Sequence, residues 1–513
     1  MKRRTIAEQE EELQAEQYTA TATTNDTKKH DADTATADRI FAKALTDLSL
    51  NDRTAIEDEI HGVTCMAVEE TPSLLELSLI NFGLELEKIN PKPVFDKAQQ
   101  LLLVSSRESS RCYINEKNFR LRFLRCELFD VRKAAKRFIR YLDFVAEVYG
   151  EYALQRPICM SDFSREEMSF LREGGWQLLP YRDRSGRRIL AQVSNHEEYD
   201  KVSKQTYLKV CFYILNASID SCDTTNNDFN NIESLQKGVV LVGYLLPNNY
   251  IASTKSNLEI HRVRLSSLAR ILQCVPIRIV SIHLCYPNTE AYKIKGKIFS
   301  MVSSVWNTRA KIHLGNPVEW RYALQGYGIP TGLIPITNTG TIKLDNWKKW
   351  IKLRKYTEQQ DRPMTVSMKT SMKTPMNSIV ECPGSNDVVF RRGTTMNYHP
   401  GNVKFQNVIE SQLQHHSNPN TTKAQQKAIE FEVIQNVRKV GGRFLKWESD
   451  KGWWINMSVE MCVDLNSDID MDVINISTMN SVPTGANIDT DSDRNTNENT
   501  NENVNVNVNV NVN

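Results

Sequence analysis

The stretch from Arg278 to Lys311 constrains the fold most, because it joins a strand pattern to a helix pattern across Pro287. Its first part, RIVSIHLC, is rich in residues that favour strands, and alternate side chains of a strand point to opposite faces of a sheet. One face would belong to the core, and the other could line a cavity. The predicted faces carry Val280, Ile282 and Leu284 on one side and Ile279, Ser281, His283 and Cys285 on the other.

After Pro287 the apolar residues take up helical spacing over residues 288–306. Lysines gather near the start of this predicted helix, at Lys293, Lys295 and Lys297. A helix of this kind can cover an apolar pocket with one face while its lysines meet an anionic surface. The apolar stripe consists of Tyr292, Ile294, Ile298, Met301, Val302 and Val305.

Strands and helices alternate before this stretch, which predicts an α/β sheet. Two β-rich pieces flank a turn at Asp183–Gly186 and predict a hairpin. The apolar run at 238–246 is typical of a central parallel strand that is covered on both faces. Helical patterns at 199–219 and 258–276 supply the connections between the predicted strands.

Helical patterns also precede the sheet. Thr71 followed by Pro72, and Asp130 before an apolar-faced run, are typical helix starts. The predicted fold is therefore an α/β lobe with a mixed or parallel sheet, preceded by an all-α lobe and followed by a small α+β module. The predicted boundaries are 1–35 (disordered), 36–160 (helical lobe), 161–336 (α/β lobe), 337–384 (basic helix and linker), 385–460 (small module) and 461–513 (disordered, Asn-rich).

The whole-chain totals exclude several classes of protein. A net charge of +2 over 513 residues gives no global attraction to nucleic acid or to a membrane. Because the ten cysteines form no zinc-spaced cluster, we expect reduced thiols and a cytoplasmic location, with a nuclear location left open. No secretory signal follows Met1, and the longest apolar run, 238–247, is shorter than the ~20 residues that span a bilayer. Membrane contact would be peripheral.

Motifs for catalysis are absent from the sequence. It contains no GxxxxGK[ST], GxSxG or HExxH pattern, and its nine histidines form no metal pattern. His283 could act as a base, but a single histidine on a buried strand is usually a hydrogen-bonded core residue. We therefore expect a non-enzymatic protein without a cofactor or a metal.

Two segments, FLRCELFDVRKAAKRF at 123–138 and RIVSIHLCYP at 278–287 with its following helix, resemble the CRAL-TRIO family of lipid-binding and lipid-transfer proteins. The resemblance extends over roughly residues 115–335. It implies a helical lobe followed by an α/β lobe with an apolar cavity under an amphipathic gate helix. The chain departs from the family pattern at 238–246, which lacks the usual Asp-x-x-Gly ending, and at Cys285, where the family usually has Asn.

The resemblance implies two sets of site residues. The lipid-binding set is Ile279, Ser281, His283, Tyr292, Ile294, Ile298, Met301, Val302 and Val305. The set for the head group or the membrane is Arg278, Lys293, Lys297, Arg309 and Lys311. In the related tocopherol carriers, basic residues at the positions of Arg278, Arg309 and Lys311 face phosphoinositides, while another basic position of that set is Val280 here. Surface charges without a ligand are the alternative interpretation.

Two basic regions follow the α/β lobe. Trp347 and Trp350 lie among lysines and suit either a membrane interface or, more commonly, a helix docked on the domain. Residues 385–460 then resemble a domain of unknown function that is widespread in algal proteins, through NDV at 386–388, HPGN at 399–402, GGRFL at 441–445 and Trp454. Arg391 replaces the first glycine of the GRG in that pattern.

The function we expect is binding, and either transfer or sensing, of a hydrophobic ligand such as a phospholipid, a phosphoinositide or an isoprenoid-like lipid, with transient contact to an anionic membrane. The competing hypothesis is a regulatory or nucleic-acid-associated protein with a vestigial lipid lobe. It would act through the basic residues 385–460 and bind a protein or nucleic-acid partner there. Between Asp387 and Lys451 there are ten Lys and Arg against six acidic residues, interleaved with aromatic residues. Hairpin tryptophans more often anchor a small core.

Overall fold

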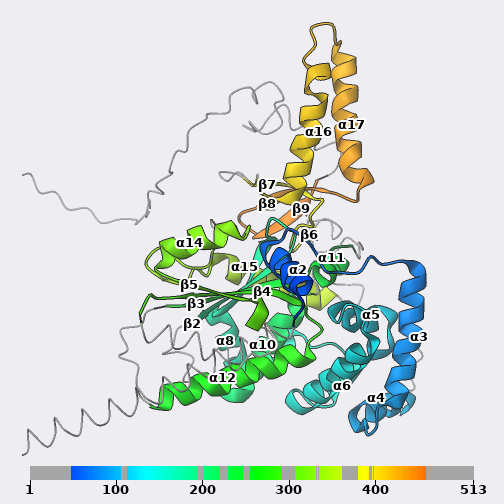
Figure 1. The fold of residues 1–513 in the computed structure, drawn as a ribbon, viewed down its shortest axis with the longest axis vertical. Coiled ribbons are helices and arrows are strands. Elements are labelled where there is room, and N and C mark those ends of the chain that lie inside the picture. Colours follow the sequence, from blue (N-terminus) through cyan, green and yellow to red (C-terminus); the bar gives the residue numbers. More distant parts are fainter. Residues whose placement is uncertain are drawn as a thin grey trace, which may run out of the picture. The chain divides into compact units, whose positions relative to one another are not determined.

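The computed structural model describes residues 48–104, 113–194, 202–219, 229–246, 255–289, 307–330, 332, 334–360, 379–391, 396 and 398–457 (Figure 1). Within these residues the protein is a mixed α/β structure with two mixed sheets, so the predicted α/β class is confirmed at this level. The predicted helix over 288–306 and the two predicted disordered tails lie almost wholly outside the described residues.

The larger sheet has five strands in sequence order. They are β1 (Trp176–Arg182), β2 (Arg188–Ser194), β3 (Val239–Leu245), β4 (Ile279–Tyr286) and β5 (Ala310–Leu314). β1 and β2 form the predicted antiparallel hairpin, and β2 to β5 are parallel. Every residue of β3 and β4 is buried, as expected for central parallel strands.

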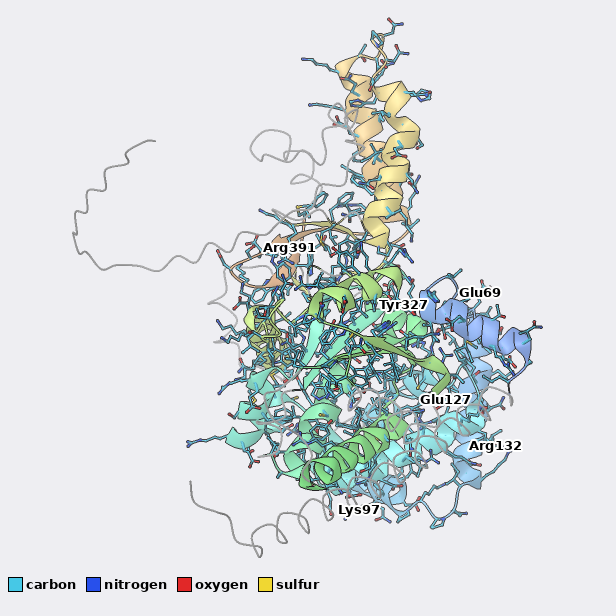
Figure 2. The ribbon with its side chains drawn as sticks, turned by 60° about the vertical axis from the view of Figure 1, so that its left-hand side comes forward. Glu69, Lys97, Glu127, Arg132, Tyr327 and Arg391 are labelled. Carbon is cyan, nitrogen blue, oxygen red and sulfur yellow. The ribbon has the colours of Figure 1, made fainter. Side chains whose placement is uncertain are left out.

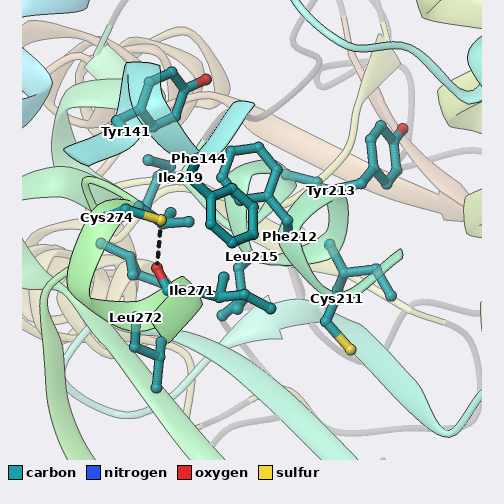
Figure 3. Close-up of a cluster of buried hydrophobic side chains, with 14 of the residues drawn as sticks. Tyr141, Phe144, Cys211, Phe212, Tyr213, Leu215, Ile219, Ile271, Leu272 and Cys274 are labelled. Atoms are coloured by element: carbon teal, nitrogen blue, oxygen red, sulfur yellow. Dashed lines mark hydrogen bonds between the residues drawn. The ribbon is translucent and has the colours of Figure 1, made fainter. Parts of the chain in front are cut away.

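Helices pack on both faces of this sheet. On one face, α8 (Arg165–Glu173), α10 (Lys204–Ala217) and α12 (Lys255–Cys274) share a continuous apolar core with the helices that precede the sheet. Figure 3 shows part of this core around Phe212 of α10. On the other face, α14 (Pro317–Gly326) buries Trp320 and Leu324 against the strands.

The helices before the sheet are α2 (Leu50–His61), α3 (Pro72–Lys88), α4 (Pro93–Val104), α5 (Lys117–Cys126), α6 (Val131–Val148) and α7 (Tyr152–Gln155). Two of these helices, α3 and α6, begin where their sequence signals predict. Thr71 caps α3 by accepting the Leu74 N–H at 3.2 Å, and Asp130 caps α6 by accepting the Lys133 N–H at 3.0 Å. The predicted apolar stripe of α6 is buried, including Phe138 and Leu142.

A bulge in β4 corrects one prediction. Val239 pairs with Ile279 but Val240 pairs with Ser281, so Val280 is an extra residue in the strand. As a result Ile279 joins Ile282 and Leu284 in the core on the α10 face, while Val280 and Cys285 join the opposite core. The strict alternation predicted from the sequence is therefore wrong for Ile279 and Val280, because the extra residue exchanges their faces.

The second sheet has the order β6-β9-β8-β7. Its strands are β6 (Ile379–Val380), β7 (Val388–Phe390), β8 (Phe444–Glu448) and β9 (Trp453–Asn456), and two long helices, α16 (Pro400–His416) and α17 (Lys423–Lys439), connect β7 to β8. Trp447 and Trp454 are buried in the small core of this module.

Candidate functional site

The basic residues that the sequence analysis assigned to a head group come together at one edge of the larger sheet. Arg278 immediately precedes β4, Arg309 ends the short 3₁₀ turn Asn307–Arg309, and Lys311 is the second residue of β5. β4 and β5 are parallel neighbours, so their amino-terminal ends lie at the same edge. Cations from two separate parts of the chain, Arg278 and the Arg309–Lys311 segment, therefore meet within one small region.

α2 covers this cluster and pairs with all three cations (Figure 1). Glu59 accepts from Arg278 Nη1 at 2.5 Å through one oxygen and from Arg309 Nη1 at 2.7 Å through the other. Lys311 Nζ donates to both oxygens of Glu57 at 2.7 Å. Since Glu59 is only 1% exposed, its pairs are shielded from solvent, whereas the Glu57 pair is half-open.

Main-chain carbonyls also hold the two arginines. Arg278 donates to Gln236 O, and Arg309 donates to Val280 O at 3.0 Å. These bonds do not involve α2, because Gln236 belongs to α11 (Phe229–Lys237) and Val280 to β4. Burial opposes ionisation of Glu59, but Arg278 and then Arg309 outweigh that effect and hold the pKa of Glu59 below its ordinary value. The two guanidinium groups therefore keep Glu59 ionised.

The carboxyl end of α2 rests on the β1–β2 turn. Arg187 Nη1 donates to the main-chain oxygens of Glu59 and Ile60, at 2.5 and 3.2 Å, and Ser185 Oγ donates to Gly62 O at 2.8 Å. Gly62 ends the helix with a left-handed backbone at φ 72°, a conformation that favours glycine. These contacts are polar, and Ile60 is the apolar side chain that α2 buries fully.

An aromatic cluster lies next to these ion pairs. His283 Nδ1 and His313 Nε2 are 3.0 Å apart, and the ring of Tyr327, labelled in Figure 2, lies 4.5 Å from the ring of His283. His61 of α2 stacks on the same tyrosine at 4.5 Å. Burial and the neighbouring His313 lower the pKa of His283 well below its ordinary value, and burial followed by Lys311 lowers the pKa of His313 to about 4.

Three buried polar atoms near α2 and β4 have no hydrogen-bond partner among the described residues. They are Arg187 Nη2, Ser281 Oγ and His283 Nε2. Such atoms are uncommon in folded proteins, and they are often found where a ligand or an ordered water binds. A cluster of His, Cys, Asp and Glu suited to a metal ion does not occur in the part of the chain that the structure describes.

The remaining predicted site residues fall into two groups. Ile279 is in the core on the α10 face, away from Ser281 and His283 on the α2 face. The predicted gate-helix residues, Tyr292, Lys293, Ile294, Lys297, Ile298, Met301, Val302 and Val305, lie outside the described residues.

Sequence reasoning missed five residues of this site. Four of them contact a predicted site residue: Glu57, Glu59, His313 and Tyr327. The fifth, Arg187, contacts Glu59. The available signal was the acidic run EDE at 57–59 in a helix with little apolar character, which predicts polar docking.

Several tryptophans and arginines after the larger sheet have structural roles. α15 (Asp345–Gln360) buries Trp347 and Trp350, so the docked helix is confirmed over a membrane-facing one. In the C-terminal module, Arg443 pairs with the buried Asp387 at 2.7 Å, and the Arg391 guanidinium lies over the Trp447 ring at 5.2 Å.

Comparison with known proteins bears on the C-terminal module. Residues 387–465 match the family model of a domain of unknown function (DUF6824), which supports the predicted identity of this region. A search of curated proteins found no match to the chain. Of the helices in the described ranges, none has the length and apolar content needed to cross a bilayer.

Proposed function

We propose that this protein binds a hydrophobic lipid with an anionic head group and carries out no catalysis. The observation that carries the proposal is the convergence of Arg278, Arg309 and Lys311 at the amino-terminal edge of β4 and β5. The segment predicted as an amphipathic gate helix connects β4 to Arg309, so the cation cluster lies at one end of that segment. An apolar chain under the gate helix and a phosphate at the cations would use both features.

The energetics of such binding are favourable. Each methylene removed from water contributes about 0.8 kcal/mol, so an acyl chain of about 15 methylenes needs few specific polar contacts. Two guanidinium groups and one ammonium group would then discriminate between head groups by charge. In this proposal the helices before the sheet form an all-α lobe, the five-stranded sheet and its helices form the lipid-binding lobe, and the DUF6824 module recruits a partner.

The competing function, binding of nucleic acid through the C-terminal module, has less support. Stacking on bases needs exposed aromatic side chains. Trp447 and Trp454 are buried in the module core, and the Trp454 Nε1–H donates to Pro180 O at 2.9 Å. These contacts favour a structural role for the tryptophans.

Mass spectrometry of lipids extracted from the purified full-length protein tests the proposal. We expect co-purified lipids with acyl or isoprenoid chains and a phosphate group. Arg309→Gln should reduce the anionic fraction at least about fivefold because it removes one of two guanidinium groups. Lys352→Gln, on an exposed position of α15, is the matched control and should have no effect. Failure to recover any lipid, together with failure to bind added anionic lipid, would refute lipid binding.

A further inference from the structure

Glu59 occupies the cation cluster in the way that an external anion would. Its two oxygens contact Arg278 and Arg309 separately, and a main-chain N–H, that of Met66, donates to it at 2.9 Å. A guanidinium pair plus a backbone N–H is a common arrangement for binding phosphate. We propose that α2 is a displaceable cover whose Glu59 occupies, from within the chain, a binding site for a phosphate-bearing group.

The attachment of α2 is consistent with displacement. α2 is anchored mainly by ion pairs and by hydrogen bonds to its last turn, while Leu50 at its start and Val63 just after it are 76% and 73% exposed. An element that buries few apolar side chains loses little hydrophobic free energy when it leaves the protein surface. Its ion pairs are exchangeable, because an incoming dianion can replace both carboxylates.

The two arginines of the cation cluster also have partners outside α2. Gln236 O and Val280 O hold Arg278 and Arg309, and Asp183 holds Arg187. A phosphate offers more acceptor oxygens than one carboxylate, so it could contact both arginines together with Lys311. The unpartnered Arg187 Nη2 and Ser281 Oγ are further donors on the same side of the sheet.

Gly62 provides a way to open the cover without changing any residue that would bind the ligand. A Cβ at this position would lie 1.9 Å from Ser185 Oγ, and the backbone is in the left-handed region at φ 72°. Gly62→Ala should therefore lift the last turn of α2 from the β1–β2 turn. Glu59→Gln acts independently by removing the internal anion. Glu85→Gln, which removes a carboxylate from an exposed pair with Lys88 on α3, is the matched control.

Hydrogen-exchange mass spectrometry of the full-length protein reports the state of α2 directly. The probes are inorganic phosphate, vesicles of phosphatidylcholine, and the same vesicles with phosphatidic acid added. Inorganic phosphate and the vesicles with phosphatidic acid, whose phosphate groups carry a net negative charge, should speed exchange in residues 50–61 instead of slowing it. Vesicles of phosphatidylcholine alone should not, because choline balances the charge of the phosphodiester. Gly62→Ala and Glu59→Gln should show fast exchange without a ligand and bind the effective probe at least about tenfold tighter, because no cover has to be displaced. Arg309→Gln should lose the response.

The proposal that α2 is a displaceable cover depends on the proposed lipid binding only for the source of the phosphate. The outcomes of these experiments distinguish failure of the cover from failure of lipid binding. If inorganic phosphate opens α2 but no lipid binds, the cover stands and lipid binding fails. If anionic lipid binds while exchange in α2 stays the same or slows, lipid binding stands and the cover is overturned. Equal affinity of Gly62→Ala, Glu59→Gln and Glu85→Gln, or no binding of any probe to any variant, would also overturn it. Circular dichroism establishes that each variant is folded.

Discussion

The Glu381 carboxylate forms ion pairs with two buried arginines and accepts a hydrogen bond from a buried tryptophan. Arg188 of β2 contacts it at 2.9 Å, Arg354 of α15 at 3.3 Å, and Trp350 Nε1 at 3.0 Å. Arg188 is 1% exposed, so its guanidinium has no access to water once this carboxylate is neutral. Breaking a buried ion pair on one side costs more than the pair itself contributes.

We therefore expect Glu381→Gln to lower the free energy of unfolding by about 3–5 kcal/mol. Urea denaturation followed by tryptophan fluorescence and by circular dichroism measures this change. Glu85→Gln on the exposed face of α3 removes the same charge without desolvated partners and should leave the midpoint unchanged. A midpoint for Glu381→Gln equal to that of the control would show that Arg188 finds another partner.

His313 makes stability depend on pH. Its pKa is lowered to about 4 by burial and by Lys311, from an ordinary value of 6.5, so between these values the unfolded chain binds more protons than the folded one. Stability is then complete above pH 6.5 and declines as pH falls towards 4. His313→Gln should reduce this acid-induced loss by about 1–2 kcal/mol, an amount that allows for partial exposure of the ring.

Thermal denaturation at several pH values between 7 and 4 checks the histidine prediction. His415→Gln, at an exposed position near the end of α16, should reproduce the wild-type slope. If the denaturation temperatures of wild type and His313→Gln fell equally with pH, another group would cause the acid sensitivity. One such group is the buried His399, whose pKa is also lowered to about 4 by burial.

At the scale of single elements, local sequence signals predicted the first residues of helices α3 and α6 and the position of strand β3. Thr71 and Asp130 cap their helices as expected, and the apolar run of β3 is buried throughout. The bulge at Val280 could not be predicted, because neither a glycine nor a turn residue marks it. The pairing of Glu59 with Arg278 could not be predicted either, since 219 residues separate them and no local pattern connects them.

Two helical glycines allow a matched prediction about elements. Gly401 lies in the first turn of α16, where an added Cβ would meet Asp387 O at 1.9 Å, whereas Gly83 of α3 has open space at that position. Gly401→Ala should push α16 away from β7 and strain the bond from the Val389 N–H to Asn402 at 2.8 Å. We expect a loss of about 1–3 kcal/mol.

Gly83→Ala should instead stabilise the protein by about 0.5–1 kcal/mol, because alanine restricts the unfolded chain and favours the helix. Differential scanning fluorimetry and urea denaturation of both variants measure the difference. If Gly401→Ala and Gly83→Ala changed stability in the same direction, the close approach of Gly401 to Asp387 O would not be the cause of the effect.

At the scale of the whole chain, the C-terminal module shares buried polar contacts with the larger sheet. Arg182 of β1 donates to Pro383 O at 2.7 Å, and Glu233 of α11 (Phe229–Lys237) accepts from the Ser385 N–H at 3.0 Å. The sequence predicts a linker at residues 379–384, because Cys382-Pro383-Gly384 is a turn-like run. In the structure, however, residues Ile379 to Cys382 are buried. Short-range composition does not reveal burial by elements far away in the chain.

These contacts predict that the two sheets unfold together. Removal of residues 379–513 would leave the buried Arg188 without its ion-pair partner Glu381. Arg182 would lose Pro383 O and keep Gly186 O and Ser234 Oγ. We expect the shortened chain to unfold at a much lower temperature than the full chain or to fail to fold. Removal of residues 465–513, which lie outside the described residues, is the matched control and should leave the calorimetric transition unchanged. A shortened chain ending at 378 that keeps the full-length transition temperature would mean that the larger sheet is stable alone and that its buried arginines are satisfied without the module.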